Sequence, residues 1–169
     1  MRFITEKNEK TIAEKFIAEA KVMAQKATCH RAKCGAVIVG GNEIIGIGFN
    51  SPPGNDERER RCEIEKDEFN QKITDKTCCV HAEQRAIMDA LRCHPDKIKG
   101  SKLYFSRFHP DGRQRFLGGE IQLYCTICAK MMHDTGISEF ILSHQDGIVS
   151  FSRDEYVGRS FMDNKYTKI

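Results

Sequence analysis

The sequence predicts an α/β fold, a three-layer α/β/α sandwich. Segments with helical periodicity alternate along the chain with short β-rich segments, which is the pattern of such a fold. The connections between them are short, which makes at least some neighbouring strands parallel, with crossover helices between them. The length of 169 residues is in the usual range of one domain, so we expect a single domain over residues 1–169.

Composition excludes several classes of protein. Hydrophobic residues make up 40% of the chain and charged residues 30%, which excludes disordered and fibrous architectures. A net charge of +3 is too small to indicate a nucleic-acid or anionic membrane partner. The amino terminus becomes charged too early for a signal peptide, and no apolar run could span a bilayer. We therefore expect a cytoplasmic protein without a membrane partner.

The first predicted elements are a helix and a β-hairpin. Residues 11–14 fit a capping box, although a start one turn earlier is also compatible with the apolar stripe. Residues 35–39 predict a strand, residues 40–42 a tight turn and residues 43–50 the returning strand. Gly46 and Gly48 indicate a close approach to the backbone. The stripe of the helix recurs at steps of three and four residues: Ile12, Ala13, Phe16, Ile17, Ala20, Met23, Ala24 and Ala27.

A long polar loop separates this hairpin from the second helix. Residues 51–80 combine turn chemistry with a mixed charge run, and a helical turn is expected within 67–75. A loop of this length in a compact domain is usually functional or held by a metal. Helical periodicity resumes at Ala82, Ala86, Ile87, Ala90 and Leu91.

The second half alternates again. The sequence predicts a strand at 102–106, a loop at 108–123, a helix at 125–135 with Gly136 as its cap, and a strand at 139–142. Beyond Gly147 there is no clear pattern, apart from the start of a short helix at 154–156. We expect a core over about residues 10–145 and a carboxy-terminal extension over 146–169.

Cysteines are unusually informative here. Nothing directs the chain to secretion, so clustered cysteines are better interpreted as metal ligands than as disulfides, although free cysteines are also common as small buried hydrophobes. Spacing has to decide between these uses. The eight cysteines are Cys29, Cys34, Cys62, Cys78, Cys79, Cys93, Cys125 and Cys128.

Two motifs at predicted helix starts form a candidate zinc site. The first is His81-Ala82-Glu83 and the second is Cys125-Thr126-Ile127-Cys128. Cysteines three apart share a helix face, and the helix dipole favours their thiolates. One His and two Cys leave a fourth tetrahedral position open, which is typical of catalytic zinc. Glu83 is then placed to accept a proton from a water at the metal without being a ligand.

Neither motif is specific alone. His-x-Glu is usually an exposed helix start, and Cys-x-x-Cys also occurs in redox-active and structural zinc sites. In this order, each opening a helix after a β segment, the two motifs together indicate catalytic zinc.

The pair resembles the signature of the zinc-dependent cytidine and deoxycytidylate deaminase superfamily, His-x-Glu followed by Pro-Cys-x-x-Cys. The resemblance covers about residues 10–145. It implies a cytidine-deaminase-like fold with a central mixed sheet of about five strands. The deoxycytidylate deaminase branch is the most similar, through residues 28–31 (Thr-Cys-His-Arg), 34–39 (Cys-Gly-Ala-Val-Ile-Val), 48–53 (Gly-Phe-Asn-Ser-Pro-Pro), 80–87 and 125–130.

The resemblance implies a hydrolytic deamination of dCMP to dUMP with release of ammonia. Zinc would be held by His81, Cys125 and Cys128, and Glu83 would be the general acid and base. The backbone at Gly35-Ala36 would bind the base edge, and Asn50 the sugar or base. Without the resemblance, Asn50 would be interpreted as a turn residue at a strand end. Family members are usually oligomers, so we expect a homo-oligomer.

A nucleotide phosphate would need arginines. Seven arginines are available for this purpose, most of them expected on the solvated surface: Arg31, Arg58, Arg60, Arg61, Arg107, Arg113 and Arg115.

The resemblance also suggests a second, structural zinc, which some deoxycytidylate deaminases bind. Cys29, Cys62 and either Cys78 or Cys79 occupy the corresponding places. Only one of the adjacent pair would be a ligand, since their side chains point to different faces of an extended segment. Cys79 is favoured because Cys78 would pack into the core. Cys34, a His or a water would complete the set, and buried free thiols are the alternative.

Two departures from the family pattern bear on the substrate. Tyr124 replaces the proline before the first ligand cysteine, and about residues 108–123 are inserted where the family has a short loop. Two other functions therefore remain open. One is a deaminase of a nucleoside, guanine, a pterin precursor or tRNA adenosine; the other is a non-catalytic zinc module, which would not need the carboxylate of Glu83.

Overall fold

The centre of the protein is one mixed sheet. The computed structural model describes residues 1–69, 78–118 and 125–162, and in it the strand order is β1-β7-β6-β4-β2-β3, with β5 paired to β4. The five longer strands are β2 (Lys33–Gly40), β3 (Glu43–Phe49), β4 (Lys102–Phe108), β6 (Glu139–His144) and β7 (Gly147–Ser152). Two strands have only two residues each, β1 (Arg2–Phe3) and β5 (Gln114–Arg115). The predicted sheet of about five strands is confirmed, with two short additions.

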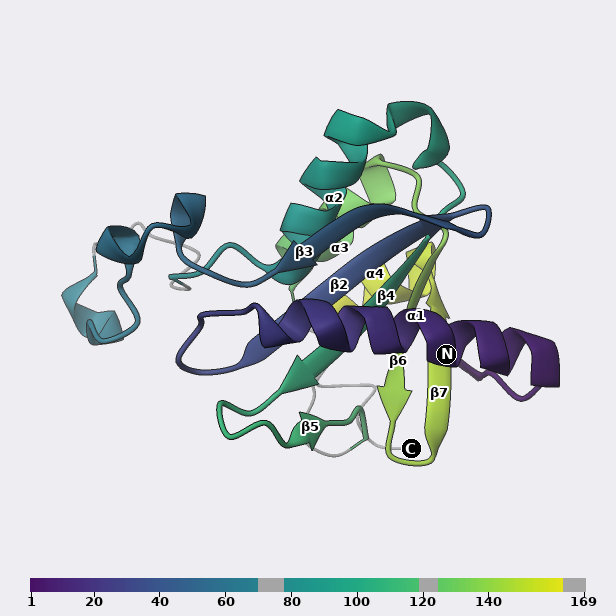
Figure 1. Ribbon diagram of the computed structural model, residues 1–169, viewed down its shortest axis with the longest axis horizontal. Coiled ribbons are helices and arrows are strands. Elements are labelled where there is room, and N and C mark those ends of the chain that lie inside the picture. The colour runs from purple at the N-terminus through teal and green to yellow at the C-terminus, as the bar shows by residue number, and fades with distance from the viewer. Residues whose placement is uncertain (70–77, 119–124, 163–169) are drawn as a thin grey trace.

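Helices cover both faces of this sheet, so the predicted three layers are confirmed. Helix α1 (Lys7–Gln25) crosses one face, and α2 (Ala82–Cys93), α3 (Thr126–Asp134) and α4 (Arg153–Met162) lie on the other (Figure 1). Strands β4 and β6 are parallel and α3 lies between them in the chain, which is the crossover that the sequence predicts. Four short 3₁₀ turns are Pro53–Asn55, Glu57–Glu59, Lys66–Glu68 and Pro95–Lys97.

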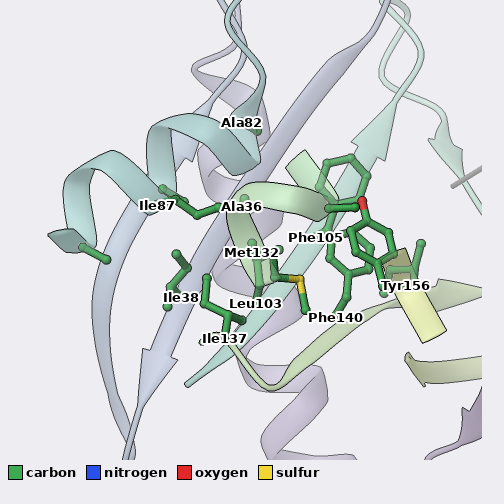
Figure 2. Packing of buried hydrophobic residues seen from close by; sticks show 14 of the residues in the cluster. Ala36, Ile38, Ala82, Ile87, Leu103, Phe105, Met132, Ile137, Phe140 and Tyr156 are labelled. Carbon is green, nitrogen blue, oxygen red and sulfur yellow. The ribbon is translucent and has the colours of Figure 1, made fainter. Parts of the chain in front are cut away.

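Side-chain alternation along the strands divides the core in two. On each strand, every second side chain points to the face that α1 covers. There Val37, Val39, Tyr104 and Ile141 pack with Phe16, Ile17 and Ala20. The side chains between them point to the opposite face, beneath α2, α3 and α4. There Ala36, Ile38, Leu103, Phe105 and Phe140 pack with Ile87, Met132 and Tyr156 (Figure 2). The second cluster lies directly behind the helix starts that bear the two motifs.

The structure corrects the boundaries at both ends. Helix α1 begins at Lys7, and the carboxylate of Glu6 caps it by accepting from the backbone N–H groups of Asn8 and Glu9 at 3.0 and 2.7 Å. The capping box at residues 11–14 is therefore wrong, and the earlier start is right. Ile12 is 42% exposed, so the buried stripe is narrower than the sequence indicates.

The carboxy-terminal segment has more structure than its sequence pattern indicates. Strand β7 pairs with β6, and α4 packs against α3. Val149, Phe151 and Tyr156 belong to the core cluster beneath α2. None of the helices in the described part of the chain is both long enough and apolar enough to cross a membrane.

Candidate metal centre and active site

The structure brings the three predicted zinc ligands together. The donor atoms of His81, Cys125 and Cys128 all lie within 4.8 Å of one another. His81 Nδ1 is 3.3 Å from Cys128 Sγ. His81 caps the amino end of α2, and Cys125 caps that of α3. Because the two helices begin side by side on one face of the sheet, residues 47 positions apart in the chain meet there.

Local capping fixes these donors. The backbone N–H of Cys128 donates to Cys125 Sγ at 3.3 Å, and that of His81 donates to Gln84 Oε1 at 2.9 Å. A hydrogen bond with the side chain of Cys128 is the largest effect on the pKa of Cys125 and lowers it to about 4; the hydrogen bond and charge of His81 and the backbone N–H of Cys128 also lower it, and together they outweigh burial, which raises it. One imidazole nitrogen and two sulfurs, one of them a thiolate near neutral pH, fit zinc.

Glu83 lies in the first turn of α2 and is only 8% exposed. Burial raises the pKa of its carboxyl group, and the charge of Cys125 raises it further, while the charges of His81 and Arg107 lower it. Glu83 does not belong to the group of donor atoms that meet. The carboxyl group is therefore beside the candidate metal site, protected from bulk water, and able to hold or release a proton.

Tyr156 is a residue near the site that sequence reasoning missed. Its buried ring stacks on Phe140 with centroids 4.2 Å apart and 6° between the planes (Figure 2). Burial raises its pKa well above the ordinary value, and the charges of Glu83, Cys128 and Cys125 add to this rise. The only signal in the sequence was the start of a helix at 154–156, which does not indicate where that helix packs.

The two predicted substrate-binding residues lie at the strands beside the site. Ala36 is fully buried on β2, with Gly48 of β3 and Phe105 of β4 opposite it. Asn50 follows β3 and is 7% exposed. Its Oδ1 accepts from the backbone N–H of Cys34 at 2.7 Å, and its Nδ2 donates to Ala32 O at 2.9 Å. Asn50 thus fastens the start of β2, and its contact with substrate stays a prediction.

A second group of cysteines also forms. The sulfur atoms of Cys29, Cys62 and Cys79 lie within 4.8 Å of one another. The segment that bears Cys62 leaves the fold after Ser51, where the backbone N–H of Val80 donates to Ser51 O at 3.0 Å. Burial and the charge and hydrogen bond of Cys29 raise the pKa of Cys79.

The prediction that Cys78 packs into the core is wrong. Cys79 is the buried member of the adjacent pair, and Cys78 is half-buried. Cys78 Sγ accepts from the backbone N–H of Arg61 at 2.9 Å instead of packing into the core. Cys34 does not belong to this group of sulfurs. Tyr124 and most of the helical turn expected within 67–75 fall outside the described residues.

Comparison with known proteins identifies the family. The family model of the cytidine and deoxycytidylate deaminase zinc-binding region matches residues 10–144. A deoxycytidylate deaminase of Mycobacterium phage D29 is 32% identical over 100 residues, which are 56% of this chain and 76% of the relative. A deoxycytidylate deaminase of Schizosaccharomyces pombe (strain 972) is 24% identical over 146 residues. This match covers 83% of the chain but only 38% of the length of the yeast protein.

Solved structures share the fold. The dCMP deaminase of cyanophage S-TIM5 in complex with dCMP and dUMP has a TM-score of 0.57 at 23% identity, covering 82% of this chain and 83% of the phage chain. A cytidine deaminase from Burkholderia pseudomallei has a TM-score of 0.53 at 17% identity, covering 85% and 94%. The match of the zinc-binding region spans both helix starts that bear His81, Cys125 and Cys128, and the chain belongs to the cytidine and deoxycytidylate deaminase family.

Proposed function

We propose that the chain is a zinc-dependent hydrolase that converts dCMP to dUMP with release of ammonia. The observation that carries this function is a buried carboxyl group, Glu83, beside three converging zinc donors. Burying a carboxyl group without pairing it costs stability, which a purely structural zinc site would have no need to do. The 32% identical phage relative is a deoxycytidylate deaminase, which supports a cytosine nucleotide as the substrate.

Each residue has a defined task in this reaction. His81, Cys125 and Cys128 would hold the zinc, which when bound would lower the pKa of a water from about 15.7 towards 7. Glu83 accepts a proton from the water whose oxygen adds to C4 of the cytosine ring, and it delivers that proton to N3. Glu83 then takes the remaining proton of the added hydroxyl and passes it to the amino group. The C4–N bond breaks, ammonia leaves, and the water oxygen stays on the ring as the carbonyl of uracil.

The neighbouring residues shape the pocket. Asn50 and the Gly35-Ala36 backbone are our candidates for substrate contact, and Tyr156 is buried where the charge of Glu83 acts on it. Cys29, Cys62 and Cys79 are our candidates for a structural zinc, supported by the 4.8 Å grouping of their sulfurs. The cytoplasmic location and the homo-oligomer stay predictions.

Zinc content and ammonia release test this function together. We expect the purified chain to contain zinc and to release ammonia from dCMP in a panel of cytosine and purine nucleotides, nucleosides and bases. A Cys125→Ala variant is expected to lose the catalytic zinc and the activity. Release from guanine or adenosine but not from dCMP would replace the proposed substrate. An intact, zinc-loaded chain without activity on the whole panel would favour a non-catalytic module.

A further inference from the structure

The inserted segment between β4 and α3 places two arginines side by side. Its short strand β5 pairs with the end of β4, so that Arg115 lies opposite Arg107. On the other side of β4, Arg107 lies opposite Cys34 of β2. Directly opposite residues share one face of a sheet, and alternate residues of one strand do the same. Arg107 is two residues beyond Phe105, which packs beneath α2 to α4, so both arginines belong to the face that holds Glu83.

Arg107 has an unsatisfied donor in the described part of the chain. Within residues 1–69, 78–118 and 125–162, the side chain of Arg107 has no ion-pair partner, and its Nε is buried without a hydrogen-bond acceptor. Arg115 is held in place differently, since its Nη2 lies 2.8 Å from His109 Nδ1. An anion beside Arg107 would accept from this buried donor.

Electrostatic contacts connect the two arginines with the candidate active site. Burial raises the pKa of Cys34 to about 12, the charge of Glu83 also raises it, and the charges of Arg107 and Arg115 lower it. The charge of Arg107 acts on Glu83 as well. Cys34 therefore lies within electrostatic reach of both the arginine pair and the catalytic carboxyl group. An anion bound by these arginines would therefore lie on the same side of the sheet as Glu83.

We propose that Arg107 and Arg115 form an anion subsite that binds the phosphate group of the nucleotide, and that this subsite makes the enzyme select nucleotides over nucleosides. The proposal rests on the function proposed above and adds the residues that recognise the phosphate. Both side chains are guanidinium forks, which bind phosphate oxygens in a bidentate geometry. The inserted segment is then a specificity device, because it contributes Arg115 and holds it beside Arg107.

The test compares substrates with and without phosphate on the zinc-loaded chain. We expect Arg107→Gln to lower kcat/KM for dCMP by about 10- to 100-fold, the loss typical of one or two charge-assisted hydrogen bonds. The value for deoxycytidine should fall much less, because only the effect of the Arg107 charge on Glu83 is lost there. Arg107→Lys keeps the charge but loses the fork, so its loss on dCMP should be smaller. If Arg107→Gln fails to fold, Arg115→Gln tests the same subsite. Arg115 lies on β5, a two-residue strand outside the main path of the sheet, so its substitution should disturb folding less.

The matched control is Arg113→Gln. Arg113 lies on the same inserted segment, its side chain is exposed, and its Nε is 2.9 Å from Asp111 Oδ2. This variant should leave kcat/KM unchanged for both substrates. Equal losses for dCMP and deoxycytidine in the Arg107 or Arg115 variants would indicate a structural role and overturn the subsite, as would no loss at all.

Calorimetric binding of dUMP and deoxyuridine separates this proposal from the function. We expect the wild-type chain to bind dUMP more tightly than deoxyuridine and Arg107→Gln to reduce the difference. If the chain shows this preference but never releases ammonia, the deaminase reaction is wrong and the subsite stands. If it releases ammonia but binds both ligands equally, the reaction stands and the subsite is wrong.

Discussion

Glu83 is a carboxylate in the first turn of a helix and is also buried. Its position in the first turn of α2 puts its charge near the helix amino terminus, and its burial raises the pKa of the carboxyl group. A buried carboxyl group next to zinc donors can exchange protons with a substrate without competition from bulk water.

A Glu83→Gln variant tests this role. The amide keeps the size and hydrogen-bonding capacity of the side chain but accepts no proton, so we expect kcat to fall by about 10²- to 10⁴-fold or more. Zinc content and the thermal midpoint should be retained, because Glu83 is not among the converging donors. Turnover within a few-fold of wild type in a zinc-loaded sample would remove Glu83 from the proposed mechanism.

At the scale of elements, the position of α2 depends on two glycines in β3. A Cβ on Gly48 would lie 2.1 Å from Ala82 O and 2.5 Å from Ala86 N, and one on Gly46 would lie 2.4 Å from Ala86 O. The expected close approach at Gly46 and Gly48 is therefore confirmed, and the approaching element is the backbone of α2. His81 and Glu83 stand at the end of α2 that this contact fixes.

We expect Gly48→Ala to displace the start of α2. The added methyl group meets backbone rather than a flexible side chain, so the overpacking should lower the free energy of unfolding by about 1–3 kcal/mol. Zinc affinity and activity should fall with it. Gly158→Ala adds the same methyl group where nothing lies within 4 Å and is the control. Denaturant unfolding and zinc titration of both variants measure the difference, and equal behaviour would contradict the argument.

The loop between β3 and α2 is the second element that bears on the site. Its sequence is rich in charged and polar residues, which offer little apolar surface to bury, and a metal bound by Cys29, Cys62 and Cys79 would contribute folding free energy.

Counting zinc per chain tests this proposal. We expect about two zinc ions in the wild-type chain and about one in a Cys29→Ser/Cys62→Ser variant, with deamination reduced less than by Cys125→Ala. Cys93→Ser changes an exposed cysteine on α2 and should alter neither quantity. A wild-type count of one that the double variant leaves unchanged would show that these sulfurs are only buried thiols.

At the scale of the whole molecule, one carboxylate on β6 connects that strand with three others, β4, β7 and β1. Glu139 of β6 accepts from Lys102 Nζ of β4 at 2.6 Å, from Ser150 Oγ of β7 at 2.5 Å, and from Arg2 of β1 at 3.2 Å. Burial raises the pKa of Glu139, but the hydrogen bonds and charges of these partners outweigh it, and the pKa lies below its usual value.

The sign of the pH dependence follows from this lowered pKa. The stabilisation is fully present above the pKa of the unfolded state, about 4.3, and is lost as the pH falls through the lower folded value. We expect Glu139→Gln to reduce the free energy of unfolding by about 1–2 kcal/mol at pH 7, and the difference from wild type to disappear in acid. Glu14→Gln, an exposed change of equal charge on α1, should show no such difference. Urea unfolding at several pH values measures it, and a constant difference would contradict the assignment.

Local patterns in the sequence were enough to predict the order of helices and strands and the residues that would meet at the candidate metal site. The alternation of elements predicted the layers, and the two motifs predicted which donors would meet, because a helix start holds residues three apart on one face whatever surrounds it. The apolar stripe of α1 was right except at its start and at Ile12, where capping and exposure depend on contacts with the remaining chain.

Tertiary structure alone decided what packs around those motifs. The two-residue strand β5 has too few residues for a periodic signal, yet its pairing puts Arg115 opposite Arg107. Strand β7 and helix α4 lack a clear sequence pattern, yet they bring Val149, Phe151 and Tyr156 into the core cluster beneath α2 and α3. The physical reason is that pairing and burial join residues far apart in the chain, so their partners cannot be determined from the local sequence.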